Sequence, residues 1–429
     1  MGAEAGAIAP AGGGAKLSRA TRLFQKLLIR VEVMSRRSSL GLVFLLATFA
    51  PVACLESSDN PTLKPSGGLG GAGSPAVAEG GSEAGLEPEL GTDLPIPDCA
   101  PALDHGVRMV GRYDGCDARG PRFSWPGTGF VARFQGTGLA ITLDTAPGYY
   151  TVLVDGAVSP ELTTVGGVQS DVLISGLGAA EHVVELYRQG EASLGSTVLL
   201  GVEVTEGNLL APPPASDRRI ELLGDSISAG YGNEGADSSC SFSAETENHF
   251  LTYGAVLARH FDAELSTLAW SGKGVVFNYG GNQDTPLPEM MDRAHPASSK
   301  SVWDYQLAPA PDVVLINLGT NDFSSQVDPT AEVFTAGYVA LLARLRARYP
   351  GAHILCTVGP MLSGTDLDAA RSGIEAAVTL RQADGDQRVS SYALTTLNSS
   401  PGCGFHPSTS THAEMATELA VPVAAALGW

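Results

Sequence analysis

Short stretches in which apolar and polar residues alternate fill the chain between residues 107 and 204. A period of two is typical of β-strands that have one buried face, and Gly or Pro separates the stretches as it does strands. The expected strands are residues 130–134, 139–144, 150–155, 171–175, 181–188 and 197–204. No convincing amphipathic helix interrupts them. The pattern predicts an N-terminal all-β sandwich of the jelly-roll type.

From residue 219 onward, buried apolar strands alternate with helical patterns. The expected strands are residues 220–223, 264–269, 313–318, 354–358 and 389–397. The expected helices are residues 250–261, 331–349, 367–382 and 411–427. Such alternation predicts an α/β domain with a parallel sheet between helices. Ligands bind at the carboxyl ends of the strands in sheets of this kind.

The first strand of the α/β region ends in Gly224-Asp225-Ser226, and the residues that follow suit the start of a helix. Backbone N–H groups in a first helical turn have no partner within the helix, so they can stabilise an oxyanion formed at an attacked carbonyl. Ser226 is therefore the candidate nucleophile. By itself the turn is weak support, because Asp and Ser are also ordinary turn and N-cap residues.

Three other segments hold residues that could act together with Ser226. Asn321 follows the strand at residues 313–318, Gly272 follows the strand at residues 264–269, and His406 lies in a loop before the last helix. Together they supply an amide donor, a backbone donor and a base. In this order the four segments resemble the conserved blocks of the SGNH (GDSL-type) hydrolases.

Two segments of the β region narrow the resemblance. Gly111-Arg-Tyr-Asp114 and Gly120-Pro-Arg-Phe-Ser-Trp-Pro-Gly127 are similar to family 2 carbohydrate esterases, and the resemblance covers residues 107–429. Enzymes of that family join a jelly roll to an SGNH domain and remove acetyl groups from plant-type polysaccharides. The resemblance implies that the oxyanion is held by the N–H groups of Ser226 and Gly272 and by the side-chain amide of Asn321.

The expected reaction is a two-step acyl transfer with His406 as general base and then general acid. His412 is expected inside the last helix as a surface or packing residue, whereas Pro407 keeps His406 in a loop. In SGNH relatives an acid stands two or three residues before the histidine, but this chain has Cys403 and Gly404 there. We therefore expect a dyad in which a backbone carbonyl orients His406.

A carboxylate from elsewhere in the chain could orient His406 in place of the backbone carbonyl. Asp384 or Asp386 is the alternative source of an acid for His406. Asp225 is read as a structural turn residue, since it is too close in sequence to Ser226 to orient a histidine on the far side.

Aromatic residues near the four segments are candidates for stacking on a sugar ring. They are Trp303, Trp270 and Tyr231, and Trp303 is preferred because the esterase family carries a similar aromatic loop at this position. Core packing is an equal possibility for Trp270. Trp125 is expected to be a packing residue.

The six cysteines fit an exported protein, in which disulfides can form. Cys99 and Cys116 are one candidate pair, and Cys240 and Cys403, which flank the proposed site, are another. Cys356 lies in an apolar strand and is expected in the core.

The N-terminal segment resembles a targeting sequence rather than a folded domain. A start at Met34 would give a secretory signal of normal length, and residues 51–54 resemble a lipoprotein cleavage box with Cys54 as the lipidated residue. Cleavage by the ordinary signal peptidase is the alternative. The predicted organisation is a targeting segment at residues 1–54, a disordered Gly/Ser/Pro-rich tether at 55–97, the β-sandwich at 98–210 and the hydrolase domain at 211–429.

The net charge of −20 argues against nucleic-acid binding. No metal-ligand spacing is visible and the mechanism requires no cofactor. We therefore expect an exported esterase, either a cell-envelope lipoprotein or a secreted protein, that acts on acetylated polysaccharide of the xylan or glucomannan type. The alternatives are a GDSL-type lipase or thioesterase and a non-catalytic, glycan-binding surface lipoprotein.

Overall fold

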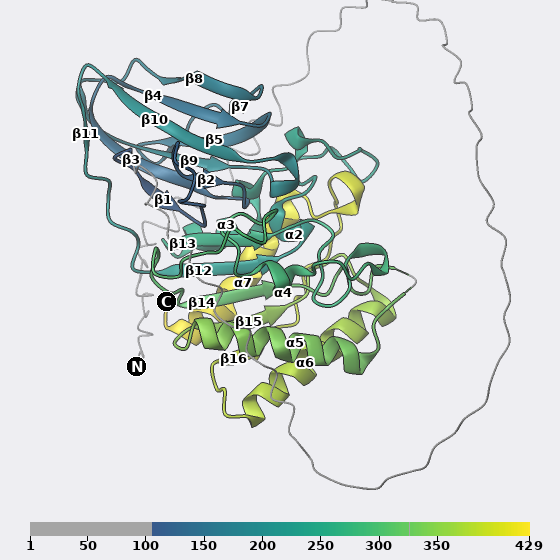
Figure 1. Cartoon of the computed structure of the whole chain (residues 1–429). Coiled ribbons are helices and arrows are strands. Elements are labelled where there is room, and N and C mark those ends of the chain that lie inside the picture. Colours follow the sequence, from purple (N-terminus) through teal and green to yellow (C-terminus); the bar gives the residue numbers. More distant parts are fainter. Residues whose placement is uncertain (1–104, 326) are drawn as a thin grey trace, which may run out of the picture. The chain divides into compact units, whose positions relative to one another are not determined.

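The computed structural model describes residues 105–325 and 327–429 (Figure 1). Their strands form a seven-stranded and a four-stranded antiparallel sheet, followed along the chain by a five-stranded parallel sheet. Met34, Cys54, Cys99 and the predicted tether lie outside the described residues.

The two antiparallel sheets pack face to face across one apolar core. The larger contains β1 (Arg108–Val110), β3 (Gly129–Gly136), β5 (Gly148–Val154), β6 (Ala157–Val158), β7 (Leu162–Thr164), β9 (Ala180–Arg188) and β11 (Asn208–Leu210). The smaller contains β2 (Arg122–Phe123), β4 (Gly138–Thr145), β8 (Gly167–Ile174) and β10 (Thr197–Thr205). Phe130 and Leu186 from the first sheet share the core with Leu139 and Leu199 from the second. The prediction of an antiparallel all-β region is confirmed, and its jelly-roll topology stays a prediction.

The parallel sheet has the strand order β13-β12-β14-β15-β16, which confirms the predicted α/β architecture. Its strands are β12 (Arg219–Gly224), β13 (Glu264–Ala269), β14 (Val313–Asn317), β15 (His353–Thr357) and β16 (Val389–Ser391). The strand expected to run to residue 397 stops at Ser391. Beyond it, the Glu418 carboxylate accepts the backbone N–H groups of Thr395 and Thr396, so these groups are not available for a ladder.

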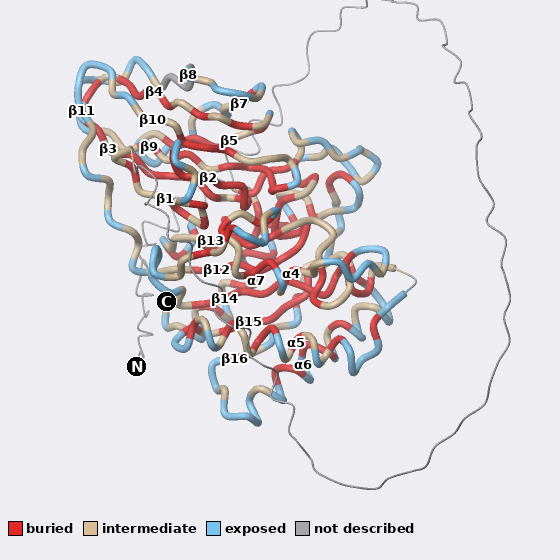
Figure 2. Tube along the Cα trace, in the orientation of Figure 1, coloured by how far each residue is buried: buried red, intermediate tan, exposed pale blue. Residues whose placement is uncertain are grey.

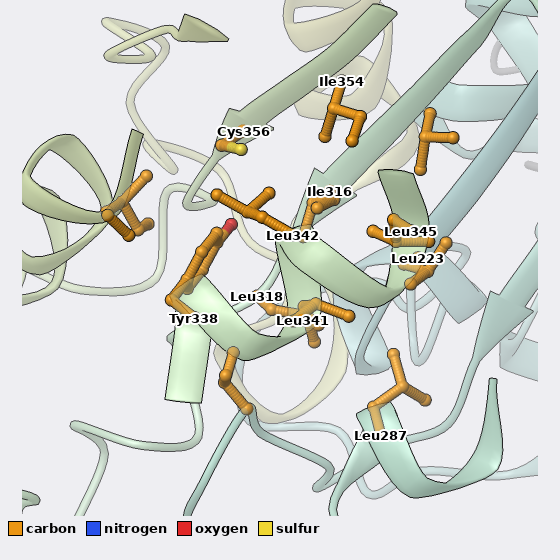
Figure 3. Packing of buried hydrophobic residues seen from close by; sticks show 14 of the residues in the cluster. Leu223, Leu287, Ile316, Leu318, Tyr338, Leu341, Leu342, Leu345, Ile354 and Cys356 are labelled. Atoms are coloured by element: carbon orange, nitrogen blue, oxygen red, sulfur yellow. The ribbon is translucent and has the colours of Figure 1, made fainter. Parts of the chain in front are cut away.

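Alternate residues of the parallel strands face different helix layers. The helices are α3 (Tyr253–His260), α5 (Ala331–Arg348), α6 (Gly364–Ala383) and α7 (Thr409–Leu427). Leu223 and Ile316 pack with α5 and α6, whereas Leu222 and Leu315 pack with α3 and α7. Figure 3 shows side chains of α5, among them Tyr338, pointing toward Ile316 and Cys356. Cys356 is a fully buried free thiol, as predicted.

The remaining helical segments are short. They are α2 (Ser226–Ala229), α4 (Leu287–Met290) and the 3₁₀ turns η1 (Ala192–Leu194), η2 (Ala244–Thr246), η3 (His249–Leu251), η4 (Tyr279–Gly281) and η5 (Cys403–Phe405). Within the described residues, no helix combines the length and the apolarity needed to cross a bilayer.

The β-sandwich and the α/β region share a buried boundary. Trp125 is fully buried in the core of the α/β region, where its indole N–H donates to the Arg293 carbonyl at 3.1 Å. Its predicted packing role is confirmed. In Figure 2 the parallel strands β12, β14 and β15 are buried along most of their length, because helices cover both faces of the sheet.

Arg112 of the β-sandwich forms a buried ion pair with Glu221 of the α/β region. Its guanidinium donates to both oxygens of Glu221 at 3.1 and 3.0 Å, to the Tyr349 hydroxyl at 3.2 Å and to the Met291 carbonyl. Arg112 is 1% exposed and Glu221 is 4% exposed, so neither charge reaches water.

We expect Arg112→Ala to lower the free energy of unfolding by about 3–5 kcal/mol, because it leaves the Glu221 carboxylate buried without its partner. Urea unfolding followed by tryptophan fluorescence measures the loss. Arg119→Ala is the matched control, since Arg119 pairs with Asp117 and Asp144 at the surface and should matter little. Equal losses in the two variants would contradict this interpretation.

Candidate active site

Ser226 lies two residues after the end of β12, at the first position of α2, and is 6% exposed. The Asp225 carboxylate caps this single helical turn by accepting the Ile227 N–H at 3.0 Å. Gly224 permits the tight corner, because a Cβ there would lie 1.9 Å from the Ser228 hydroxyl oxygen. The predicted strand-to-helix corner is therefore present.

His406 follows η5, and its ring points toward Ser226. Its Nε2 lies 2.8 Å from Ser226 Oγ, and its Nδ1 lies 3.2 Å from the Gly404 carbonyl oxygen. The second contact fixes the tautomer, since Nδ1–H donates to the carbonyl and leaves Nε2 to accept from the serine. Burial lowers the pKa of His406 to about 4, although the hydrogen bonds to Gly404 and Cys403 oppose the shift.

Neither of the alternative acids reaches His406. Asp386 pairs with Arg346 at 2.9 Å, and Asp384 lies 3.6 Å from Arg381. Asp225 is fully buried at the cap of α2, and burial raises its pKa to about 7. Among the described residues, the His406 ring is hydrogen-bonded to the Ser226 hydroxyl and to backbone carbonyl oxygen, and no carboxylate is among its partners. The structure thus supports the predicted backbone-oriented dyad over a carboxylate triad.

The loop that carries His406 is linked covalently and by hydrogen bonds to the loop that follows Ser226. A disulfide joins Cys240 and Cys403, one of the two candidate pairs. The Cys403 N–H donates to the Gly232 carbonyl at 3.0 Å, and the Thr409 N–H donates to the Asn233 carbonyl at 3.1 Å. These links hold the histidine loop in place from both sides.

His412 packs against α3. It is buried in α7, stacks on Tyr253 and accepts the Tyr253 N–H through Nδ1 at 3.2 Å. Its packing role therefore matches the sequence expectation.

Gly272 and Asn321 follow the ends of β13 and β14, the two strands that flank β12. In the described residues, the N–H groups of Ser226 and Gly272 have no hydrogen-bond partner. Asn321 Nδ2 donates to the Lys273 carbonyl at 2.9 Å and lies 3.3 Å from Asp225 Oδ2. The side-chain amide of Asn321 therefore connects the nucleophile turn to the Gly272 loop.

Asp322, next to Asn321, holds the far side of that loop. Its carboxylate accepts the N–H groups of Val275, Val276 and Phe277 at 2.8 to 2.9 Å. Burial nevertheless raises the pKa of Asp322. The sequence placed this acid beside the candidate amide but indicated no partner for it.

The expected aromatic residues divide between two places. Tyr231 lies at the site, where its ring stacks on Phe242 and lies 4.3 Å from the His406 ring between centroids. Trp270 is half-buried and packs against the core of the α/β region.

The preference for Trp303 was wrong. Trp303 is 5% exposed, lies beneath the Arg112 guanidinium and contacts the edge of Tyr113. It lines a cavity at the start of β12, the end opposite Ser226. The similarity of the loop sequence did not reveal that the β-sandwich covers this tryptophan.

Two exposed aromatic residues beside the site were missed. Tyr279 is 67% exposed, and its N–H donates to the Gly272 carbonyl at 2.8 Å. Phe405 is also 67% exposed and precedes His406, with a φ of 64° that is unusual for a bulky residue. Proximity in sequence to Gly272 and His406 was the available signal.

In the part of the chain that the structure describes, no group of three or more His, Cys, Asp or Glu side chains is arranged to hold a metal ion. Independently of this, the site brings together the Ser226 hydroxyl, the His406 imidazole and two backbone N–H groups that have no partner among the described residues. This combination suits attack on a carbonyl carbon.

Known families match both regions of the chain. The family described as carbohydrate esterase 2 N-terminal matches residues 109–214, and the GDSL-like lipase/acylhydrolase family matches residues 222–413.

Individual relatives agree with these matches. The cellulase/esterase CelE of Acetivibrio thermocellus is 38% identical over 330 residues, which cover 76% of this chain and 40% of that protein. An acetylxylan esterase / glucomannan deacetylase of Cellvibrio japonicus is 26% identical over 334 residues, which cover 76% of this chain and 91% of that protein.

A solved structure extends the match to three dimensions. It is that of a family two carbohydrate esterase from Clostridium thermocellum in complex with cellohexaose, with a TM-score of 0.72 and 36% sequence identity. The match covers 75% of this chain and 99% of that one. This chain therefore belongs to the family 2 carbohydrate esterases.

Proposed function

We propose that the protein removes O-acetyl groups from a polysaccharide of the xylan or glucomannan type through an acyl-enzyme on Ser226. The observation that carries the proposal is the 2.8 Å contact between Ser226 Oγ and His406 Nε2, in a chain whose relatives include acetylxylan esterases. The aligned part spans 40% of CelE, so the activity is inferred for the present chain from its own site.

The first step is attack of Ser226 Oγ on the acetyl carbonyl carbon. His406 Nε2 takes the hydroxyl proton, and the C–O bond to the sugar breaks as that proton passes to the leaving alcohol. In the second step water, deprotonated by the same nitrogen, attacks the carbonyl carbon of the acetyl-serine. The C–O bond to Ser226 breaks as the proton passes from His406 to Oγ, and acetate is released. The imidazolium formed in each step is held by the Gly404 carbonyl rather than by a carboxylate.

The oxyanion is held by the N–H groups of Ser226 and Gly272 and by the amide of Asn321. The two N–H groups are free to donate, and each donor of this kind is typically worth ~3 kcal/mol in the transition state. Asn321 keeps its bond to the Lys273 carbonyl, while its long 3.3 Å contact with Asp225 is the one an oxyanion would replace.

Tyr279 and Phe405 are the aromatic surfaces proposed for the sugar, in place of Trp303. One follows the Gly272 loop and the other precedes His406, and both rings are largely exposed. Aromatic faces suit the apolar C–H surface of a sugar ring, so the polysaccharide would lie across the catalytic pair.

The location of the protein is proposed from the sequence pattern. The targeting segment at residues 1–54, with its signal starting at Met34 and its lipidation site at Cys54, lies outside the described residues. The Cys240–Cys403 disulfide supports an oxidising, exported environment. An anchored or secreted esterase would meet its polysaccharide outside the cell.

We expect the purified protein to release acetate from acetylated xylan or glucomannan and to hydrolyse p-nitrophenyl acetate faster than longer esters. Ser226→Ala should lower kcat by roughly 10⁶-fold, because the nucleophile is lost. A preference for acyl chains beyond butyrate would instead indicate a lipase or thioesterase. Binding to acetylated glycans without acetate release would indicate a non-catalytic binding protein.

On the acid side of the pH profile, its acid limb, kcat/KM should fall to half its maximum at a pH of about 4, which is below the usual pKa of histidine. Burial disfavours the imidazolium, so His406 stays neutral and competent as pH falls until the pH approaches its pKa of about 4. A pH profile on p-nitrophenyl acetate from pH 3 to 9 measures the limb. Because Asp225 has a pKa of about 7, a limb near 7 that disappears in Asp225→Asn belongs to Asp225. A limb near 6.5 that persists in this variant would contradict the assignment to a buried His406.

We expect Gly404→Asp to retain or raise kcat and to move the acid limb upward by about one pH unit, because it brings a carboxylate to His406. A Cβ at residue 404 would lie 3.7 Å from His406 Nδ1, so the carboxylate can reach this nitrogen. Gly404→Ala is the control, since both variants place a side chain at a φ of 60°. A limb that moves equally in both would refute the electrostatic explanation.

A further inference from the structure

We propose that Glu191, which belongs to the β-sandwich, is a positioning residue for the oxyanion donor at Gly272. The inference rests on the proposed esterase function and adds a residue to it. It makes the sandwich a part of the catalytic apparatus in addition to any part it has in binding polysaccharide.

Glu191 spans the boundary between the two regions. It precedes η1, just after β9, and one carboxylate oxygen accepts the backbone N–H of Ser271 at 2.6 Å. Ser271 is the residue before Gly272. The other carboxylate oxygen accepts the Ser193 hydroxyl at 2.6 Å.

The Ser271 bond constrains the next N–H group along the chain. Peptide groups are planar, so only two dihedral angles separate the orientation of the Ser271 N–H from that of the Gly272 N–H. Glu191 occupies the Ser271 donor, and in the described residues the Gly272 donor stays free. The hydrogen bond from the Ser271 N–H to Glu191 therefore restricts the direction in which the Gly272 N–H points.

Glu191 is itself held from several directions. Its own N–H donates to Glu247 at 3.0 Å, and its carbonyl accepts a guanidinium N–H of Arg188 at 3.2 Å. Glu191 is 3% exposed, and a carboxylate this deeply buried is costly unless its oxygens accept hydrogen bonds. Both oxygens do so, and one of the two donors belongs to the oxyanion loop.

The far side of the loop is held separately by Asp322, which accepts the N–H groups of residues 275–277. Gly272 thus lies between two buried carboxylates, one from the sandwich and one from the α/β region. Loss of the Glu191 contact would free only the side nearer the nucleophile. We therefore expect loss of transition-state stabilisation without loss of the loop as a whole.

The test uses the full chain with three substitutions at one position. Glu191→Met keeps a similar volume but removes both acceptors. Glu191→Asp keeps the charge but withdraws the carboxylate by one methylene group. Glu191→Gln keeps an oxygen for the Ser271 N–H and has an amide that can donate to the Ser193 hydroxyl.

Glu191→Met and Glu191→Asp should lower kcat on p-nitrophenyl acetate by about 10²-fold, the size expected for a catalytic group misplaced by about 1 Å, with KM little changed. Phenylboronic acid forms a tetrahedral adduct on an active-site serine, and its inhibition constant should rise by a similar factor. Glu191→Gln should stay close to the unaltered protein in both measurements. A role in stability alone would change the melting temperature but neither of these constants.

Glu264→Met is the matched control, because Glu264 begins β13, pairs with Arg108 of the sandwich and lies at the end of the strand away from Ser271. It should lower the melting temperature and leave kcat and the boronic acid constant unchanged. The proposal is overturned if folded Glu191→Met and Glu191→Asp keep the kcat and the phenylboronic acid inhibition constant of the unaltered protein. It is also overturned if Glu191→Gln lowers kcat as much as Glu191→Met does. If Glu191→Met does not fold, Glu191→Asp decides by the same measurements.

The outcome is separable from the proposed function. An unaltered protein that hydrolyses no acetyl ester would refute the esterase activity. The boronic acid constants of the same variants would then still decide whether Glu191 positions the Gly272 donor.

Discussion

The parallel pairing of β12 with β13 and β14 is the constraint on which the site depends. Gly224 at the end of β12 lies opposite Ala269 of β13 and Asn317 of β14. Three strands therefore end at one edge of the sheet, and the residues that follow them are delivered to the same place. A shift of register by one residue would also turn each strand's apolar side chains toward the wrong helix layer.

The proposed base reaches this edge from a different part of the chain, so its loop needs separate restraints. His406 lies 180 residues after Ser226 and follows no strand of the sheet. The Cys240–Cys403 disulfide and the backbone bond from Cys403 to Gly232 hold its loop against the nucleophile loop. With the Gly404 carbonyl as the partner of Nδ1, orientation comes from the fold of the loop. In the proposed reaction, the weaker stabilisation of the imidazolium would leave more of the acceleration to the N–H groups of Ser226 and Gly272 and the amide of Asn321.

Buried charges join the sandwich to the α/β region at both ends of the sheet. Arg112 meets Glu221 near the start of β12, and Glu191 meets the Ser271 N–H beyond the end of β13. Such groups are tolerated only when their partners are in place, so they favour one relative arrangement of the two regions. The apolar contact of Trp125 supplies packing at the same boundary.

Local pattern was sufficient for a large part of the fold and site. Alternation with a period of two predicted the antiparallel strands, and the change to alternating strands and helices predicted the parallel sheet. The position of Ser226, Gly272 and Asn321 after successive strands was enough to bring them together, because parallel strands present their carboxyl ends at one edge. The missing acid before His406 was also visible, since it depends only on which residues occupy positions 403 and 404.

Contacts between distant segments were decided only by the tertiary structure. Trp303 was misassigned because its burial depends on how the sandwich covers the start of the sheet, which no local pattern records. Tyr279 and Phe405 were missed for the same reason, since exposure is a property of the whole fold. The contact between Glu191 and Ser271 joins residues 80 positions apart in two different regions. A single glutamate in a loop has no periodicity, and only the packing of the two regions gives it a partner.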